Sequence, residues 1–294
     1  MTIGTKPPAD IIIDPSLVRA LLQEQHPDLA HLVPVKVAEG WDNSLFRLGD
    51  ELAVRLPRRA ASATLIEHEQ RWLPHLSPRL PVPVPVPLRV GVPGRLFGWA
   101  WSVVRWLPGQ SLLSAVPLDL VTTGAMLERF LRALHHPAPA DAPRNPWRGV
   151  PLEARTEALL KHLQQLDGAV DRDAVLRVWD RALSATPWPG PPLWLHGDLH
   201  PGNLLVSDSR LVGVIDFGDL TSGDPATDLA VLWMLPRSMR WRFAAWAGDE
   251  PEALKARARG WALALGLAYR AQSRDDGALA SLGQRTIDAA LDEP

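Results

Sequence analysis

The sequence predicts an α+β protein of two lobes, divided near residue 108. Short apolar segments separated by Gly, Pro and Asp turns dominate the first 107 residues, which is typical of strands. Amphipathic helical segments dominate after residue 117, with one strand-rich insert over residues 193–215. We therefore expect a small β-rich N-terminal lobe, residues 1–107, and a larger, mainly helical C-terminal lobe, residues 108–294.

The N-terminal lobe is expected to begin with a helix, because Asp14 is a good cap and Pro15 suits the first helical position. Proline at every second position of residues 81–87 removes hydrogen-bond donors, so this segment is predicted to be an extended connector. The elements predicted for this lobe are, in order, a helix from Pro15 to about residue 26, three strands within residues 33–57, a helix over 60–76, and a hairpin of 88–92 with 99–107.

The C-terminal lobe is predicted from helical spacing of its apolar residues, with turn residues between the segments. Its predicted helices cover residues 118–135, 152–166, 171–185, 225–235, 241–247, 252–268 and 278–291. Within the insert, two apolar strands, residues 203–206 and 211–215, flank a polar turn. Most of the 13 tryptophans, such as Trp72, Trp179 and Trp233, fall at helical apolar spacing and are expected in the core.

Composition excludes several classes of protein. The formal net charge of −2 gives no basic excess for binding nucleic acid, and the absence of Cys removes disulfides, thiolate metal sites and cysteine nucleophiles. No apolar stretch approaches the roughly 18 residues that cross a membrane, and residues 1–10 lack the apolar core of a secretory signal. We expect a cytoplasmic protein, monomer or homodimer, with no nucleic-acid or membrane partner.

The most informative segment is the polar loop that precedes the strand at 203–206. A pair of antiparallel strands brings its outer ends together, so Asp198, Asn203 and Asp216 are expected to converge. Carboxylate and amide oxygens suit Mg²⁺, and a carboxylate left free of the metal can orient a hydroxyl and take its proton. The spacing of these three residues is typical of enzymes that transfer phosphoryl groups.

Three runs carry a resemblance to a known family: HGDLHPGNL at residues 196–204, VIDFG at 214–218 and GDPATD at 223–228. Together they resemble the aminoglycoside phosphotransferase family. The resemblance implies a protein-kinase-like fold with a nucleotide-binding N-terminal lobe and a C-terminal lobe for catalysis and acceptor binding. It implies transfer of the γ-phosphate of ATP, with GTP as an alternative, and a need for Mg²⁺. The implied acceptor is a hydroxyl of an aminoglycoside-like or macrolide-like antibiotic, or of a related metabolite, with antibiotic resistance as a possible role.

The same resemblance assigns roles to individual residues. Asp198 resembles the catalytic base, and Asn203 and Asp216 resemble the Mg²⁺ ligands. His196 would brace the loop, and a supporting position is also expected for His200. Two further carboxylates, Asp224 and Asp228, are expected to cap a helix and hold the loop.

The nucleotide site departs from the family pattern at one position. Kinase-like folds place a Lys on the third strand, paired with a helix Glu, but this sequence has no Lys between residues 37 and 160. Arg55 occupies that place and Glu69 is its expected partner, whereas Glu67 would point to another face. Arg offers a planar fork instead of a point charge, so the substitution leaves nucleotide affinity open.

Two segments are expected to contact the nucleotide. The turn containing Gly40, Asn43 and Ser44 resembles the nucleotide-positioning loop between the first two strands. In the resembling fold, the backbone that follows the fifth strand binds the adenine edge, which places this contact at the residues Arg105, Trp106 and Leu107.

The sequence leaves open the chemical class of the acceptor and two alternative functions. Residues 224–294 contain nearly equal numbers of acidic and basic side chains, which favours a less cationic acceptor than an aminoglycoside, such as a macrolide-like compound. One alternative is a hydrolase with a metal bound by His196, Asp198 and His200, although Pro201 argues against the extended backbone it needs. The other is a non-catalytic kinase-like binding module disabled by Arg55.

Overall fold

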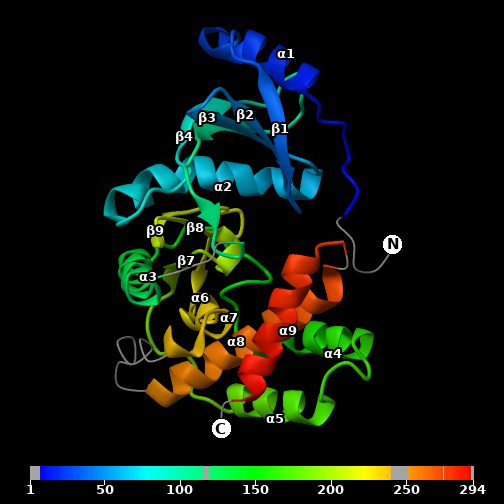
Figure 1. The fold of residues 1–294 in the computed structure, drawn as a ribbon, viewed down its shortest axis with the longest axis vertical. Helices are drawn as coiled ribbons and strands as arrows, with labels where there is room; N and C mark the ends of the chain where they lie inside the picture. Colours follow the sequence, from blue (N-terminus) through cyan, green and yellow to red (C-terminus); the bar gives the residue numbers. More distant parts are fainter. Residues whose placement is uncertain (1–6, 115–118, 240–250, 274, 293–294) are drawn as a thin grey trace.

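The computed structural model describes residues 7–114, 119–239, 251–273 and 275–292. Figure 1 shows two lobes, one with the larger sheet at one end of the molecule and a mainly helical one at the other. The predicted two-lobed α+β architecture is confirmed. The helix predicted at 241–247 lies outside the described residues.

The N-terminal lobe is a five-stranded antiparallel sheet in the order β1-β2-β3-β5-β4. Helix α1 begins where predicted, because Asp14 Oδ1 accepts a hydrogen bond of 2.8 Å from the Leu17 amide. Helix α2 packs between the sheet and the other lobe (Figure 1). The elements are α1 (Pro15–Gln25), β1 (Pro34–Glu39), β2 (Asn43–Leu48), β3 (Leu52–Pro57), α2 (Ala60–Leu76), β4 (Pro87–Gly91) and β5 (Trp101–Arg105).

Strand register decides which side chains of the sheet approach the second lobe. Arg55 lies in the central strand β3, opposite Leu45 of β2 and Ser102 of β5. Its side chain is buried, as is that of Glu69 on α2. The other face of the sheet packs against α1 through a cluster that includes Phe46 and Trp101. The apolar cluster and the buried Arg55–Glu69 pair thus lie on opposite faces of the sheet.

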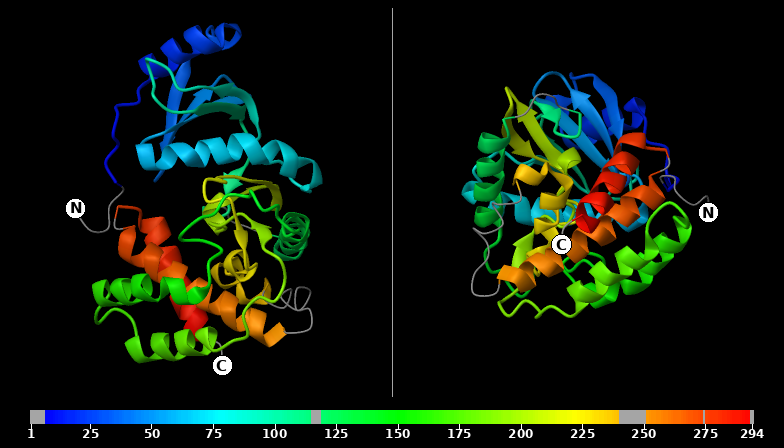
Figure 2. Two further views of the ribbon diagram at one scale, coloured as in Figure 1. Left: turned by 180° about the vertical axis from the view of Figure 1, so that it is seen from behind. Right: turned by 60° about the horizontal axis from the view of Figure 1, so that its bottom comes forward.

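The C-terminal lobe is built around the long helix α8, which packs against α4, α5, α6 and α9. Figure 2 shows these helices gathered beneath the small sheets that face the N-terminal lobe. The elements are β6 (Gln110–Ser111), α3 (Leu120–Leu134), a 3₁₀ turn (Leu152–Arg155), α4 (Thr156–Gln165), α5 (Arg172–Leu183), β7 (Leu193–Leu195), β8 (Leu204–Ser207), β9 (Arg210–Val214), β10 (Thr221–Gly223), α6 (Ala226–Leu229), α7 (Val231–Met234), α8 (Pro251–Gln272) and α9 (Gly277–Leu291).

Several details differ from the prediction. The linker predicted at residues 108–111 contains strand β6, which pairs with β8 and so belongs to the sheet β6-β8-β9. The helix predicted over 225–235 is two short helices, α6 and α7. Trp179 and Trp233 are core residues as expected, whereas Trp72 is only partly buried. Among the described residues, no helix combines the length and the apolar character needed to cross a membrane.

Candidate active site

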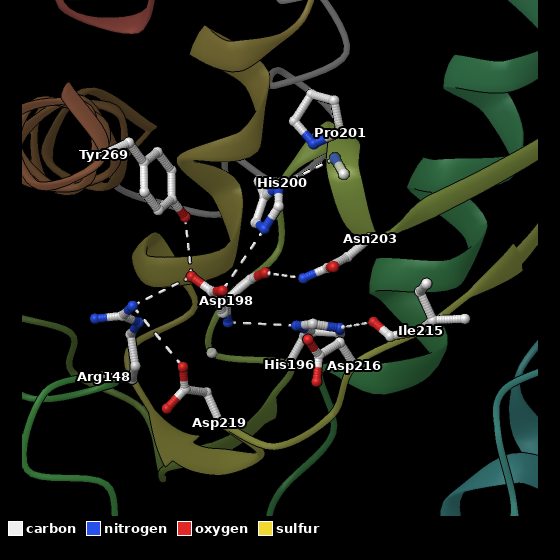
Figure 3. A network of polar contacts seen from close by, with 12 residues as sticks. Arg148, His196, Asp198, His200, Pro201, Asn203, Ile215, Asp216, Asp219 and Tyr269 are labelled. Atoms are coloured by element: carbon white, nitrogen blue, oxygen red, sulfur yellow. Dashed lines mark hydrogen bonds and ion pairs between the residues drawn. The ribbon is translucent and has the colours of Figure 1, made fainter. Parts of the chain in front are cut away.

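The loop from His196 to Asn203 is held by the side chain of its first residue. His196 is fully buried, and its Nε2 lies 3.0 Å from the carbonyl oxygen of Ile215 at the end of β9. Its Nδ1 accepts a hydrogen bond of 3.3 Å from the Asp198 amide (Figure 3). One imidazole therefore connects the loop to the strand that delivers Asp216. These are the contacts of a brace, the position expected for His196.

Asp228 of α6 fixes the same loop from the opposite side. Its carboxylate is fully buried and accepts hydrogen bonds from the amides of His196, at 2.8 Å, and Gly197, at 2.9 Å. His135 Nε2 lies 3.1 Å from the same carboxylate. Burial acts to raise the pKa of Asp228, but the contacts with His135 and the neighbouring charges hold it below its usual value. The loop is thus attached to a buried, charged anchor.

Gly197 is required by the path of the loop. Its φ of 86° lies in the left-handed region that favours glycine. A Cβ at this position would lie 2.1 Å from the carbonyl oxygen of Asp219, so no larger residue fits without moving the chain. The close passage of these two segments brings the loop beside the turn that follows β9.

Asp198, Asn203 and Asp216 converge, as Figure 3 shows. The Asn203 side-chain amide donates to the Asp198 carbonyl oxygen at 2.9 Å, and the Ile215 amide donates to the Asn203 carbonyl oxygen at 3.0 Å. Asp216 follows immediately, with a φ of 64° that turns its exposed side chain out of the line of β9. Short backbone and side-chain bonds therefore set the relative positions of all three groups.

Three polar side chains lie beside the Asp198 carboxylate. Tyr269 of α8 donates its hydroxyl hydrogen to Oδ1 at 2.9 Å, and Arg148 Nη2 lies 3.2 Å from the same oxygen. His200 Nε2 lies 3.7 Å from Oδ2. Burial acts to raise the pKa of Asp198, but Arg148, His200, the Tyr269 hydroxyl and His196 together lower it to about 2. Asp198 is therefore ionised at neutral pH.

Arg148 and Tyr269 contact Asp198 but are not identified by the sequence analysis. Arg148 lies in the loop between α3 and the 3₁₀ turn, which contains no recognised motif. Tyr269 is the only tyrosine of the chain, but a single tyrosine in an apolar helix looks like a core residue. Burial, followed by the charge of Asp198, raises the pKa of Tyr269 well above its usual value, so the phenol remains protonated.

Arg55 makes the contact expected of the missing strand lysine. Its Nη1 donates to both carboxylate oxygens of Glu69, at 2.9 and 2.7 Å. Its Nη2 donates to Asp216 Oδ1 at 3.1 Å, which joins the N-terminal sheet directly to the end of β9. Burial raises the pKa of Glu69 to about 7, although the neighbouring Arg55 acts to lower it. One guanidinium thus connects a helix carboxylate with the Asp expected to bind metal.

The turn between β1 and β2 is closed by hydrogen bonds of its own. The Gly40 amide donates to the Asn43 carbonyl oxygen at 2.8 Å, and Arg58 Nη1 donates to the Gly40 carbonyl oxygen at 2.9 Å. Ser44, the second residue of β2, is buried. Asn43 pairs with Pro57, the last residue of β3, so the turn lies at the end of the sheet from which the chain continues into α2.

In the segment after β5, one of the backbone groups expected to bind adenine is already hydrogen-bonded within the N-terminal lobe. Arg105 ends the strand, and the Trp106 amide donates to the Glu51 carbonyl oxygen at 2.7 Å. The Trp106 N–H is thus part of the N-terminal lobe, and adenine recognition through that donor is not available. The Trp106 ring lies 4.6 Å from the Arg47 guanidinium, and Leu107 approaches Gly213 of β9.

The alternative prediction, a hydrolase with a metal bound by His196, Asp198 and His200, is wrong. Among the described residues, no group of three or more His, Cys, Asp or Glu side chains could hold a metal ion. His196 Nε2 points to the Ile215 carbonyl oxygen, and His200 Nδ1 accepts from the Gly202 amide at 3.0 Å. The two imidazoles bond to backbone groups instead of converging on one point.

The two lobes, the braced loop and the Asp at the exit of β9 define a kinase-like phosphotransferase fold. The family described as "Phosphotransferase enzyme family" (APH) matches residues 35–271, most of the chain. The protein belongs to this family.

Curated relatives include an aminoglycoside 3'-phosphotransferase of Escherichia coli, 28% identical over 141 residues. A second, from Salmonella typhimurium, is 28% identical over 140 residues. Each match covers 46% of this chain and 52% of the relative, so the chain spans about half the length of the curated relatives it matches.

Solved structures are similar over nearly the whole chain. The GDP and kanamycin complex of APH(2")-IIia has a TM-score of 0.72 at 20% identity, covering 93% of this chain and 97% of that one. Macrolide 2'-phosphotransferase MphH from Brachybacterium faecium has a TM-score of 0.61 at 21% identity, covering 96% and 98%. At this level of identity, the similarity establishes the fold.

Proposed function

We propose that the protein transfers the γ-phosphate of ATP, in the presence of Mg²⁺, to a hydroxyl of a small molecule. One observation carries this proposal: Asp198, Asn203 and Asp216 meet at one place, next to a buried arginine from the other lobe. Family membership agrees with the same reaction class. In this proposal the N-terminal lobe, residues 1–107, binds the nucleotide, and the C-terminal lobe, residues 108–294, carries the catalytic residues and binds the acceptor.

Asp198 is the proposed base. Its pKa of about 2 keeps it charged at neutral pH, where it can orient the acceptor hydroxyl and accept its proton as the phosphate is transferred. A weak base of this kind contributes mainly by orientation, and general-base catalysis adds roughly 10²–10⁴-fold to a rate. His196 and Asp228 keep the carboxylate in place through the loop backbone.

Asn203 and Asp216 are the proposed metal ligands. The nitrogen of the Asn203 amide is bonded to the Asp198 carbonyl oxygen, which leaves the side-chain oxygen as the atom available to a cation. An amide oxygen and a carboxylate are hard donors, and Mg²⁺ accepts few protein ligands because it keeps several waters. The donor set therefore fits Mg²⁺, which when bound would neutralise charge on the phosphates.

Arg55, held by Glu69, is the proposed phosphate ligand of the N-terminal lobe. Its fork-shaped guanidinium binds phosphate oxygens in pairs, whereas a lysine acts as a point charge. Gly40, Asn43 and Ser44 are proposed to lie along the phosphates, and the backbone near Arg105 and Leu107 beside the base. Related structures contain GDP or AMP-PNP, so ATP is the first nucleotide to test and GTP the second.

The proposed acceptor is a hydroxylated small molecule. Similar structures contain kanamycin, gentamicin or hygromycin B, and one is a macrolide 2'-phosphotransferase. The sequence favours a less cationic acceptor, and either drug resistance or metabolism is compatible with it. A cytoplasmic location and a monomeric or homodimeric state remain predictions.

A transfer screen tests the proposal. Labelled γ-phosphate of ATP is followed into a panel of hydroxylated acceptors, with wild type, Asp198→Ala and Asp180→Ala compared. Asp180 is an exposed residue of α5, which makes it a matched control. We expect transfer by wild type and Asp180→Ala only, with ATP binding retained by all three proteins. Retained transfer by Asp198→Ala contradicts the assignment, and absence of transfer by wild type to every acceptor favours a binding module.

A further inference from the structure

Arg148 offsets the negative charge of two carboxylates next to the place proposed for the acceptor hydroxyl. Its Nη2 lies 3.2 Å from Asp198 Oδ1 and 3.8 Å from Asp219 Oδ2 (Figure 3). The side chain is only 17% exposed, so its charge is poorly screened by water. Its Nε is buried and has no hydrogen-bond partner among the described residues. A cationic acceptor approaching Asp198 would therefore meet a fixed guanidinium.

Arg155 is a second guanidinium, close to Arg148. Among the described residues, no carboxylate lies within ion-pair distance of it, and its Nη1 is buried without a hydrogen bond. Its guanidinium lies 5.3 Å from the centroid of the Trp147 ring, next to Arg148 in the chain. Burial, and then the charge of Arg148, lowers the pKa of Arg155, so the two cations lie close enough to repel one another.

The 3₁₀ turn that ends at Arg155, and the helix α4 that follows it, both pack against α8, the helix that carries Tyr269. Arg155 ends the 3₁₀ turn that leads into α4, where His162 Nε2 lies 2.7 Å from the Gln272 side-chain nitrogen. Gln272 follows Tyr269 by three residues on α8, so both lie on one side of that helix. The charge of Arg155 also contributes, after burial, to lowering the pKa of His162. Arg155 therefore ends a turn that packs against the helix carrying Tyr269.

Each of the two partly buried guanidinium groups has one donor that no described residue satisfies, although Arg148 already pairs with Asp198 and Asp219. Buried N–H groups are almost always hydrogen-bonded in native proteins, and leaving one unsatisfied costs about 1–3 kcal/mol. Arg148 and Arg155 retain one such donor each. Carboxylate and phosphate groups match the arginine fork and form charge-assisted pairs with it. An anionic group supplied by a ligand would satisfy both residues.

We propose that Arg148 and Arg155 bind an anionic group of the acceptor, a carboxylate or a phosphate ester, and so place its hydroxyl beside Asp198. This inference rests on the proposed kinase function and names the class of acceptor: a hydroxylated acid or a phosphorylated sugar. A polycationic aminoglycoside is disfavoured, because it would face two arginines where it needs free carboxylates. The chain's single tyrosine, bonded to Asp198, is the natural reporter of this site.

The test uses the full chain labelled with 3-fluorotyrosine, which gives one ¹⁹F resonance, at Tyr269. ADP and Mg²⁺ are added first to fill the nucleotide site, and then inorganic phosphate, acetate or kanamycin is titrated separately. Wild type is compared with Arg155→Gln and with Arg177→Gln, an exposed α5 arginine that gives the same change in net charge. We expect saturable shifts with phosphate or acetate, weakened about tenfold or more in Arg155→Gln only. Phosphate and acetate distinguish a phosphate ester from a carboxylate.

Three results would overturn the inference: no saturable shift with either anion, equal affinities in Arg155→Gln and Arg177→Gln, or tighter binding of kanamycin than of both anions to wild type. Thermal unfolding of Arg155→Gln serves as the control for folding, because Arg155 Nη1 has no hydrogen-bond partner among the described residues and the substitution removes only the contact with the Trp147 ring. Rescue by Arg155→Lys is expected in part, since the charge returns without the fork. Failure of wild type to bind ADP with Mg²⁺ would count against the kinase function, whereas the anion titrations report on Tyr269 independently.

Discussion

Asp228→Asn tests the claim that one buried carboxylate holds the catalytic loop. The substitution keeps the size of the side chain but removes its charge and replaces one oxygen by an NH₂ group. Asp228 Oδ2 accepts from the His196 amide and lies by His135 Nε2, whereas Oδ1 accepts from the Gly197 amide. Whichever way the asparagine is oriented, an NH₂ group faces at least one backbone N–H.

The expected loss follows from those contacts. A hydrogen bond to a charged group contributes about 1.5–3 kcal/mol, and a buried donor left without a partner costs a similar amount. Loss of one such bond, together with weakening of the others, is expected to lower the free energy of unfolding by about 3 kcal/mol. Turnover should fall as well, because Asp198 follows Gly197 directly and moves with it.

Urea unfolding monitored by tryptophan fluorescence measures the stability, and phosphate transfer measures the turnover. Asp171→Asn is the matched control, because Asp171 is an exposed cap of α5 and asparagine caps helices almost as well. The control should unfold within about 0.5 kcal/mol of wild type. If Asp228→Asn unfolds at the same urea concentration as Asp171→Asn, the anchoring role is refuted.

Three further predictions concern buried charge and backbone geometry. Arg55→Met leaves Glu69 buried without its partner and should lower the free energy of unfolding by about 3 kcal/mol, measured by urea unfolding. The double variant with Glu69→Leu should regain most of that stability but should still not bind ATP in a titration. Burial, Arg155 and Lys161 lower the pKa of His162 to about 4, so its stabilising contribution is present above pH 6.5 and is lost as pH falls toward 4. His162→Gln should therefore reduce the difference in unfolding free energy between pH 7.5 and pH 5 by about 2 kcal/mol. An unchanged difference would contradict this. Gly197→Ala should lower stability by about 2 kcal/mol or more, because its φ is positive and its Cβ would meet a carbonyl oxygen; an unaltered melting temperature contradicts the strain.

Local patterns predict much of the fold because each depends on few residues. Asp14 and Pro15 mark the start of α1, and the paired strands around residues 207–209 bring Asp198 and Asp216 together. The Arg55–Glu69 contact was also predictable, since one strand and the following helix fix both positions. These features need only alternation, caps and the order of elements.

Long-range contacts explain what the sequence could not show. Arg148 is 50 positions from Asp198 in the sequence, and Tyr269 is 71 positions from it, yet both contact its side chain. Neither residue lies in a recognisable motif. The Trp106 amide bonds to Glu51 because the hairpin turn returns beside the end of β5, a register that spacing alone does not specify. Strand β6 is only two residues long and forms because β8 is available to pair with it.

Calorimetric titration of ATP with and without Mg²⁺ tests most directly whether Asp216 belongs to a metal–nucleotide site. Asp216→Asn is the suitable variant, because asparagine tolerates the left-handed backbone at this position while the charge is removed and one oxygen is replaced by NH₂. We expect Mg²⁺ to increase the ATP affinity of wild type about tenfold or more and to have little effect on that of Asp216→Asn. An ATP affinity that is independent of Mg²⁺ in wild type, or equally enhanced by it in both proteins, would contradict the proposed site.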